Sequence, residues 1–318
     1  MKLIIQIPAF NEAKTIGEVI DGLPRELPGI GTIEVLVVDD GSKDDTAKIA
    51  REHGATVVSH QENRGLGISF QTGRETALSH GADILVTIDA DGQFPAEEIP
   101  RLIEPIKSGR AHFVTASRFL DPKYAAKGIP WVKKWGNSLV AKMISWLSGG
   151  SFTDVSCGFR AYSKEALLKL NLFGDFTYTH ETFLNIANQR MTIEEVPVEV
   201  TYYPDRKSKM AYSISRYGYR TIWIIFRTVL DHRPFTIFSA ISLIFFFFGV
   251  LSGLIPLINK IQTGMFTPYK IFGFLAGFLV ALGFLIFCIG LVADILNRLR
   301  ITQERILYEQ RSAHGKFK

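Results

Sequence analysis

Residues 87–95, TIDADGQFP, place two carboxylates directly after an apolar run that begins at Ile84. An apolar run of this kind is typical of a buried strand in a parallel sheet. Ligands bind at the carboxyl ends of such strands in open α/β folds. Only Ala90 separates Asp89 from Asp91, so an extended backbone would turn both side chains to one face. The stretch therefore predicts a central strand with two negative charges at its tip.

The two carboxylates and Gln93 form an oxygen-rich set that suits a hard divalent cation. Like charges on one face repel each other unless a cation lies beside them. The stretch holds no His or Cys that would suit zinc. The trio therefore predicts a Mg²⁺ or Mn²⁺ site. Because Asp and Gly also dominate ordinary polar turns, these residues alone leave that alternative open.

Composition and charge narrow the class of protein. The 318 residues suit one large domain with a smaller part. The chain is 47% hydrophobic with 24 phenylalanines, and much of this apolar excess lies near the C-terminus. A net charge of +5 fits nucleic acid, an anionic membrane or a phosphorylated ligand equally well. The only two cysteines, Cys157 and Cys288, lie far apart, which excludes a disulfide framework and a cysteine metal site. We expect Cys157 to be a packed residue and the main domain to face the cytosol.

Strands and helices alternate along the first part of the chain. The predicted strands cover residues 3–7, 34–38, 56–59, 84–88 and 113–116. Helical periodicity predicts helices at 12–23, 68–79 and 97–108, the first of them capped by Asn11. A glycine-rich turn at 63–67 could cradle a phosphate with its backbone N–H groups, although its spacing matches neither the P-loop nor the dinucleotide fingerprint. This alternation favours a doubly wound, mostly parallel α/β sheet.

Five blocks of sequence occur in a fixed order. They are residues 8–12 (PAFNE), 37–42 (VVDDGS), 63–65 (NRG), 89–93 (DADGQ) and 157–160 (CGFR). Together they resemble the signatures of family-2 inverting glycosyltransferases of the GT-A fold, and most of all the polyprenyl-phosphate branch with dolichyl-phosphate mannose synthases and polyprenyl-phosphate glucosyltransferases. The resemblance spans roughly residues 3–210, and ordered blocks are more specific than any single one. It implies a GT-A (Rossmann-like), mostly parallel sheet domain.

The resemblance implies a nucleotide-sugar donor at the carboxyl edge of this sheet. The implied donor contacts are Pro8, Phe10, Glu12, Asp39, Asp89 and Glu181. Glu181 would face the donor sugar, although it could equally be a surface residue. Asp91 and Gln93 would hold the Mg²⁺ or Mn²⁺ ion. Asp91 is also a catalytic candidate, because a divalent ion offsets the charge that builds on the departing nucleoside diphosphate.

The acceptor implied by the resemblance is a polyprenyl phosphate. A phosphate monoester is already an anionic nucleophile near neutral pH, so it needs positioning by cations more than a strong base. The predicted acceptor contacts are Arg118, Lys133, Lys134, Asn137, Arg160, Arg206 and Lys209. Arg118 directly follows a buried strand and is a catalytic candidate. Asp154 is a further one, with a role as base left open. The alternative for the basic segments is a solvated surface.

The C-terminal part is predicted to interact with a membrane. Arginines on one face and aromatic residues on the other predict an interfacial amphipathic helix at 212–233. Residues 235–258 and 271–295 are apolar stretches long enough to cross a bilayer, with buried core helices as the alternative. Arginines flank both outer ends of this pair, against Lys260 and Lys270 in the connecting loop. This asymmetry predicts that both termini are cytoplasmic.

The predicted organisation has four parts. They are a catalytic GT-A domain at 1–211, the interfacial helix at 212–233, two transmembrane helices at 234–297 and a cytoplasmic basic tail at 298–318. We expect an integral membrane protein of the plasma membrane in a prokaryote, or of the endoplasmic reticulum in a eukaryote. No nucleic-acid partner is expected, and homo-oligomerisation is left open.

These features predict a hexosyltransferase that moves one sugar, with inversion, from a UDP-glucose or GDP-mannose type of donor to a polyprenyl or dolichyl phosphate at the cytoplasmic leaflet. A processive polysaccharide synthase is the first alternative. The absence of a Gln-x-x-Arg-Trp block and the presence of only two spans disfavour it. A non-catalytic sugar-nucleotide-binding membrane scaffold is the second alternative. Retention of Asp91 and Gln93 argues against that alternative.

Overall fold

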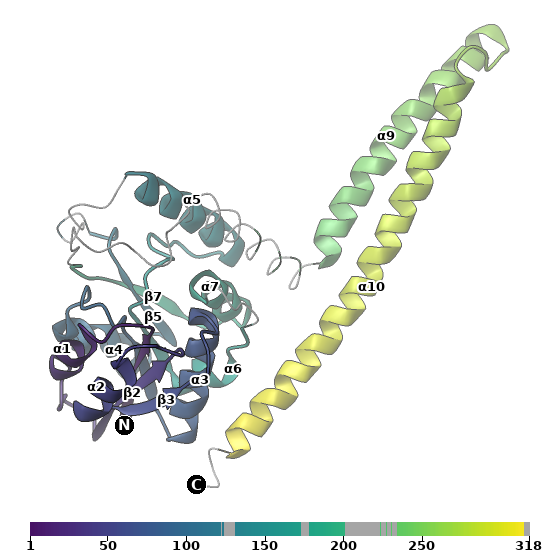
Figure 1. The fold of residues 1–318 in the computed structure, drawn as a ribbon. Coiled ribbons are helices and arrows are strands. Elements are labelled where there is room, and N and C mark those ends of the chain that lie inside the picture. The colour runs from purple at the N-terminus through teal and green to yellow at the C-terminus, as the bar shows by residue number, and fades with distance from the viewer. Residues whose placement is uncertain are drawn as a thin grey trace. The chain divides into compact units, whose positions relative to one another are not determined.

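The computed structural model describes residues 1–121, 123, 131–172, 178–200, 223, 227, 230 and 234–314. The chain forms two compact units (Figure 1). The first comprises Met1–Ile225 together with Leu307–Lys318, and the second comprises Phe226–Ile306. The first unit contains the sheet, and the second contains most of the two long apolar helices.

One seven-stranded sheet has the strand order β3-β2-β1-β4-β6-β5-β7. The strands are β1 (Lys2–Ala9), β2 (Thr32–Asp39), β3 (Thr56–Ser59), β4 (Ile84–Thr87), β5 (Phe113–Ser117), β6 (Arg160–Ser163) and β7 (Ile193–Pro197). Neighbours pair in parallel except where β6 runs antiparallel between β4 and β5. The predicted mostly parallel α/β sheet is confirmed.

The strand order reverses at β1. The chain moves from β1 outward to β2 and β3, and β4 then returns to the other side of β1. The carboxyl ends of β1 and β4 therefore flank a switch point, the place where open α/β sheets form a ligand crevice. The stretch that follows β4, residues 87–95, lies at this point.

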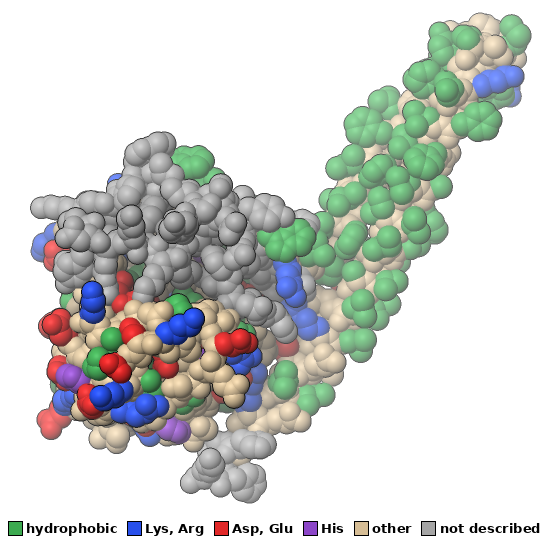
Figure 2. All heavy atoms as spheres, in the orientation of Figure 1, with side chains coloured by type: hydrophobic (Ala, Val, Ile, Leu, Met, Phe, Trp, Pro, Cys, Tyr) green, Lys and Arg blue, Asp and Glu red, His purple; other side chains and the backbone are tan. Residues whose placement is uncertain are grey.

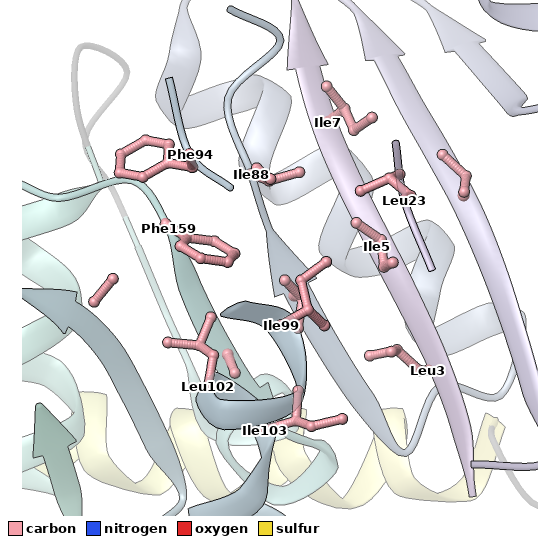
Figure 3. Packing of buried hydrophobic residues seen from close by; sticks show 14 of the residues in the cluster. Leu3, Ile5, Ile7, Leu23, Ile88, Phe94, Ile99, Leu102, Ile103 and Phe159 are labelled. Carbon is pink, nitrogen blue, oxygen red and sulfur yellow. The ribbon is translucent and has the colours of Figure 1, made fainter. Parts of the chain in front are cut away.

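Helices cover both faces of the sheet (Figure 1). The described α-helices that precede Pro234 are α1 (Ile16–Asp21), α2 (Thr46–Glu52), α3 (Leu66–Ser79), α4 (Ile99–Lys107), α5 (Trp131–Ser148), α6 (Lys164–Lys169) and α7 (Thr179–Asn188), of which α5 packs against α7. On one face, Ile5 of β1 packs in a buried cluster with Ile99 and Leu102 of α4 (Figure 3). On the opposite face Gln6 donates to Ser69 O of α3 at 3.1 Å. Alternate side chains of β1 thus contact helices on opposite faces of the sheet. The domain therefore has three layers.

The first helix is shorter than the predicted 12–23. It begins at Ile16, and Asn11 has a φ of 52°, a left-handed conformation outside the helix. Asn11 N–H donates to Ser42 Oγ at 2.9 Å, and Asn11 Oδ1 accepts from Lys43 N at 2.8 Å. Asn11 is therefore not the helix cap. It ties the loop after β1 to the loop after β2, an arrangement that helical periodicity does not reveal.

The long helices α9 (Pro234–Thr263) and α10 (Lys270–His314) are both long and apolar enough to cross a membrane. The 30 residues of α9 rise about 45 Å, against about 30 Å for a bilayer's hydrocarbon core. Their shared face carries small residues. Ser242 Oγ donates to Gly283 O at 2.7 Å, and a Cβ on Gly249 would lie 2.9 Å from Val280 Cγ2.

Large apolar side chains cover the outer surface of these helices (Figure 2). Phe247, Leu257 and Phe274, for example, are all exposed. A core helix of a soluble protein would bury such residues, whereas small residues at the contact and apolar residues outside are typical of transmembrane pairs. The arrangement favours two membrane spans over buried core helices.

The final turns of α10 group with the first unit. Arg311 Nη1 donates to Leu168 O and Asn171 Oδ1, both at 3.0 Å. Lys169 Nζ lies 5.7 Å from the ring centroid of Tyr308. The tail residues after the second predicted span therefore help to cover the region around α6, which their charge pattern alone does not indicate.

Candidate active site

The two central carboxylates lie beyond the strand, with Asp89 just before a turn and Asp91 within it. β4 ends at Thr87, and Gly92 takes a left-handed φ of 71°. The prediction that strand alternation aligns Asp89 with Asp91 therefore does not apply. Asp91 nevertheless stays near enough to act on Asp89, since burial and then the charge of Asp91 together raise the pKa of Asp89 to about 7. Positive charge from Arg118 opposes this rise.

The oxygen-bearing side chains at this turn fit a hard divalent cation as ligands. Burial and repulsion between Asp89 and Asp91 both disfavour two negative charges, and a bound cation would offset both effects. Within the described ranges, no group of three or more His, Cys, Asp or Glu side chains is arranged to hold a metal. Mg²⁺ commonly binds through one or two carboxylates and completes its shell with water and substrate phosphates. A site of this type needs no larger acidic cluster.

The loop after β1 is fastened to the same turn. Glu12 N–H donates to Thr46 Oγ1 at 2.8 Å. Thr15 Oγ1 contacts Glu12 Oε2 at 3.3 Å and donates to Ala90 O at 2.9 Å. The charge of Glu12 also contributes to the raised pKa of Asp89. The structure thus brings two predicted donor contacts, Glu12 and Asp89, into one electrostatic environment.

Other predicted donor residues lie at the ends of β1 and β2. Pro8 pairs with Val38 in the sheet, and Phe10 follows the end of β1; both side chains are half-buried. Asp39, the last residue of β2, is buried and accepts from Ser42 N at 3.2 Å. These residues lie at the carboxyl ends of β1 and β2, beside the switch point.

The glycine-rich turn at 63–67 does not have the predicted role. The N–H groups of Arg64 and Gly65 donate to the Asp40 carboxylate at 3.0 and 2.8 Å. His60 Nδ1 also lies 2.7 Å from Asp40 Oδ1. Because an internal carboxylate already accepts these N–H groups, the turn does not offer them to a phosphate.

Arg118 is held by a bidentate ion pair at the end of β5. Its Nε donates to Asp154 Oδ2 at 2.6 Å, and its Nη2 donates to Asp154 Oδ1 at 2.9 Å. Nη2 also donates to Ser156 Oγ at 2.7 Å. The fork fixes the plane and direction of the guanidinium more strongly than a single contact would. The Arg118 side chain keeps 16% of its surface exposed.

Asp154 is poorly suited to act as a base. Its side chain is fully buried, and both carboxylate oxygens accept from Arg118. Burial alone would raise the pKa of Asp154, but the charge and hydrogen bonds of Arg118, with a hydrogen bond from Ser156 N, outweigh burial and lower it. A carboxylate with a lowered pKa is a weak base. The geometry supports a positioning role for Asp154 instead.

The remaining predicted acceptor residues have different surroundings. Asn137 of α5 donates to Thr153 O at 2.8 Å and accepts from Ser156 Oγ at 3.1 Å, so both ends of its amide bind the loop around Asp154. Lys134 is exposed on α5. Lys133 belongs to α5, but its side chain lies outside the described residues, as do Arg206 and Lys209 entirely.

Arg160 binds backbone carbonyls in the interior of the domain and is not a surface cation. It is fully buried, and its guanidinium donates to Cys157 O, Thr179 O and Val155 O at 2.7, 2.9 and 3.0 Å. It also lies 5.2 Å from the ring centroid of Phe183. These contacts do not support the predicted binding of acceptor phosphate by Arg160. They indicate that it joins the 155–160 segment to the start of α7.

The first turn of α7 is buried, contrary to the surface alternative. Glu181 keeps 7% of its surface and His180 keeps 1%. Burial, followed by the charge of Arg160, lowers the pKa of His180 to about 3, so this imidazole is neutral. Burial raises the pKa of Cys157 to about 12, which confirms a packed thiol rather than a reactive one.

Gly158 lies against the central carboxylate. A Cβ at Gly158 would come within 2.9 Å of Asp89 Oδ1, and Thr87 Oγ1 donates to Gly158 O at 2.8 Å. The antiparallel strand β6 creates this approach, because it pairs Arg160 with Thr87. Sequence patterns miss β6, since its four residues include no β-branched side chain, whereas three of the four residues of β3 are β-branched.

Known proteins are similar to this chain over the region that contains the candidate site. A model of the family described as "Glycosyl transferase family 2" matches residues 4–170. The UDP-N-acetylglucosamine–dolichyl-phosphate N-acetylglucosaminyltransferase of Methanococcus voltae is 34% identical over 217 residues, covering 62% of this chain and 84% of that protein. The polyprenol monophosphomannose synthase of Mycolicibacterium smegmatis is 27% identical over 220 residues, covering 66% and 81%.

Solved structures show a similar fold. Glucosyl-3-phosphoglycerate synthase from Mycobacterium tuberculosis, crystallised with Mn²⁺, UDP and glucosyl-3-phosphoglycerate, superposes with a TM-score of 0.55. The two chains are 24% identical, and the match covers 73% of this chain and 79% of the other. The similarity supports the GT-A type of sheet domain observed here.

Proposed function

The chain belongs to glycosyl transferase family 2, and on that basis we propose that it transfers one sugar from a nucleotide donor to a polyprenyl or dolichyl phosphate. In this reaction the bond between the anomeric carbon and the donor phosphate oxygen breaks, and the nucleoside diphosphate leaves. An oxygen of the lipid phosphate forms the new bond from the opposite face of the sugar, so the anomeric configuration inverts.

One observation carries this proposal. Asp89 and Asp91 follow the end of β4 and Arg118 follows the end of β5, so two carboxylates and a guanidinium lie at one edge of the sheet. An acidic site suits the metal-bound diphosphate of a donor, and a preoriented cation suits an anionic acceptor. The relatives from M. voltae and M. smegmatis, named for dolichyl-phosphate and polyprenol substrates, add support for a lipid phosphate as the acceptor.

On the donor side, Pro8, Phe10, Glu12 and Asp39 would contact the base and ribose, and Asp89 the diphosphate-ribose region. Glu181 would face the sugar. Asp91 and Gln93 would hold Mg²⁺ or Mn²⁺, and that ion would supply positive charge to the leaving nucleoside diphosphate. Gln93 N–H donates to Asp91 Oδ1 at 3.1 Å, which helps to orient this carboxylate.

On the acceptor side, Arg118 would bind and orient the lipid phosphate, with Lys133, Lys134, Arg206 and Lys209 as further cations. Its fork to Asp154 leaves the guanidinium charge in a fixed direction before the acceptor arrives. Preorganisation of this kind lowers the entropy loss on binding. The phosphate nucleophile would need no protein base, which agrees with the low basicity of Asp154.

The decisive experiment measures release of nucleoside diphosphate by the full-length protein in detergent. A panel of sugar nucleotides, including UDP-glucose, GDP-mannose and UDP-N-acetylglucosamine, is tested with and without polyprenyl phosphate. Release that requires the lipid phosphate, with one sugar per lipid in the product, supports the proposal. Polymer formation would instead favour a processive synthase, and binding without release would favour a scaffold.

A substitution at Gly158 tests the donor half of the site. Gly158→Ala would place a methyl group within 2.9 Å of Asp89 Oδ1 and force this carboxylate to turn. Because small misplacements at a reacting centre are costly, we expect kcat/KM for the donor to fall by roughly tenfold or more. Gly136→Ala, at a position with open space, provides the matched control and should keep the donor kinetics of the wild type. Unchanged donor kinetics in Gly158→Ala would contradict the donor role of Asp89.

The proposed topology places the first unit and both termini in the cytoplasm. Thr263→Cys lies at the exposed end of α9, and Gln303→Cys lies on an exposed face of α10 beyond the apolar span. We expect a membrane-impermeant maleimide to label Thr263→Cys in intact cells and Gln303→Cys only after the cells are opened. The reverse pattern would place the reaction at the other leaflet. The described parts of the native chain contain one buried cysteine, Cys157, and one in α10, Cys288, so a Cys288→Ala background keeps labelling specific.

We also propose that the catalytic part spans 1–211, followed by an interfacial helix at 212–233, spans within 234–297 and a basic tail at 298–318. A lipid acceptor explains why a sheet domain would be attached to membrane spans. Each buried methylene contributes about 0.8 kcal/mol, so a long prenyl chain stays in the bilayer and presents only its phosphate at the surface.

A further inference from the structure

The loop that holds Arg118 is itself held from the neighbouring strand β7. The carboxylate of Glu195 accepts from Thr153 N at 2.9 and 3.0 Å and from Asp154 N at 2.9 Å. Thr153 Oγ1 also lies 3.2 Å from each of the two Glu195 carboxylate oxygens. Two successive backbone N–H groups and one hydroxyl therefore converge on a single carboxylate.

A single residue, Asp154, links the Glu195 carboxylate to the Arg118 ion pair. The Asp154 backbone donates to Glu195, and the Asp154 side chain accepts from Arg118 at 2.6 and 2.9 Å. Charge-assisted hydrogen bonds of this kind are about twice as strong as neutral ones. Any movement of the 153–154 backbone away from Glu195 would carry the Asp154 carboxylate, and with it the guanidinium, out of place.

The sheet gives this connection a rigid base. Glu195 of β7 is in register with Thr115 of β5, the strand that leads into Arg118. At the end of β5, Ser117 Oγ lies 2.7 Å from Thr153 Oγ1. The loop is thus fastened both to the strand that carries Arg118 and to the strand beside it. Two parallel strands fix its position relative to the carboxyl edge.

Burial of the Glu195 carboxylate costs free energy. Burial raises the pKa of Glu195, and the nearby charge of Asp154 adds to this rise, although hydrogen bonds from Asp154 and Thr153 oppose it. Its neighbour Glu194 is 39% exposed and lies 3.7 Å from Arg110 in a surface ion pair. A half-buried carboxylate next to a second buried carboxylate is an expensive way to hold a loop, unless the position of that loop matters.

We propose that Glu195 is a positioning residue for acceptor transfer, which clamps Thr153 and Asp154 and thereby sets the direction of the Arg118 guanidinium. This inference rests on the proposed function, in which Arg118 binds the lipid phosphate. Glu195 does not touch either substrate. It acts through Asp154 on the direction of the guanidinium and makes no contact with the Asp89–Asp91 turn in the interactions described, so its loss should weaken acceptor binding much more than donor binding.

The test compares Glu195→Gln and Glu194→Gln in the full-length enzyme. A glutamine keeps one acceptor oxygen but turns an amide donor toward backbone N–H donors, so part of the clamp is lost. We expect Glu195→Gln to raise the KM for polyprenyl phosphate about tenfold, the size of effect expected for losing a hydrogen bond to a charged group. The KM for the nucleotide sugar should change by less than about twofold, and Glu194→Gln should match the wild type.

A double variant separates positioning from general stability. In an Arg118→Lys background, Glu195→Gln should raise the acceptor KM by less than about twofold further, because coupled residues are not additive. Full additivity, or equal changes in both KM values with a lower melting temperature, would overturn the inference. Glu195→Asp keeps the charge with a shorter reach and carries the same test if Glu195→Gln does not fold.

The two proposals fail differently. If the wild type transfers no sugar to polyprenyl phosphate, the proposed function is refuted and the inference falls with it. If the wild type transfers sugar and Arg118→Lys raises the acceptor KM, but Glu195→Gln behaves like Glu194→Gln, only the inference is overturned.

Discussion

Replacing Asp91 with asparagine is expected to reduce sugar transfer by about a thousandfold while the protein stays folded, since loss of a bound metal removes several kcal/mol of stabilisation and 1.36 kcal/mol corresponds to tenfold. Asparagine preserves the shape of the side chain and can still accept from Gln93 N–H, which lies 3.1 Å from Asp91 Oδ1. What it removes is the charge that would recruit the cation. It also removes the repulsion that adds to burial in raising the pKa of Asp89.

Two further measurements make this prediction specific. Binding of Mn²⁺ to the full-length protein in the presence of nucleoside diphosphate, followed by paramagnetic resonance, should weaken in Asp91→Asn. Glu97→Gln, at an exposed acidic position shortly after the turn, should bind and transfer like the wild type. Full turnover by Asp91→Asn, or full wild-type activity in excess chelator, would remove the basis for a metal at this turn.

The second large effect is expected at Arg118, and the structure changes how it should be tested. Arg118→Ala would leave Asp154 buried without its partner, which costs about 3–5 kcal/mol of stability when a buried pair is broken. A loss of activity in that variant would therefore mix unfolding with lost acceptor binding. Arg118→Lys keeps a positive charge beside Asp154 but cannot form the bidentate fork.

We expect Arg118→Lys to raise the acceptor KM by about tenfold to a hundredfold, because lysine cannot form the bidentate fork to Asp154 that fixes the direction of the positive charge. The donor KM should stay within about twofold of the wild-type value. Arg118→Ala combined with Asp154→Ala removes both charges and should be more stable than Arg118→Ala alone. An equal rise of donor and acceptor KM in Arg118→Lys would show that Arg118 does not serve the acceptor.

The pattern of residues was sufficient for most of the fold. The strand at 56–59 has the predicted bounds, and the strands at 34–38 and 113–116 are extended by one to three residues as β2 and β5. Their apolar runs are short, local and bounded by turn residues, so nearest neighbours along the chain define them. The same holds for the two apolar stretches that became α9 and α10, since length and hydropathy are local properties.

Patterns also located Asp89, Asp91 and Arg118, but for a partly incorrect reason. The prediction assumed that an extended strand aligns the two carboxylates, whereas β4 ends at Thr87 and both carboxylates lie beyond it. Position after a buried strand was enough to place all three side chains at the carboxyl edge, because strand ends meet there whatever the local backbone does.

Tertiary structure alone decided what each polar side chain does. Arg118 and Arg160 both follow or begin a strand, yet one is forked to Asp154 near the surface and the other is buried among backbone carbonyls. Glu194 and Glu195 are adjacent in sequence, but only Glu195 faces the 153–154 loop. Hydrophobic periodicity is a local signal that the chain carries along its length. The partners of Arg118 and Glu195 come from segments about 40 residues away, and only packing of the sheet selects them.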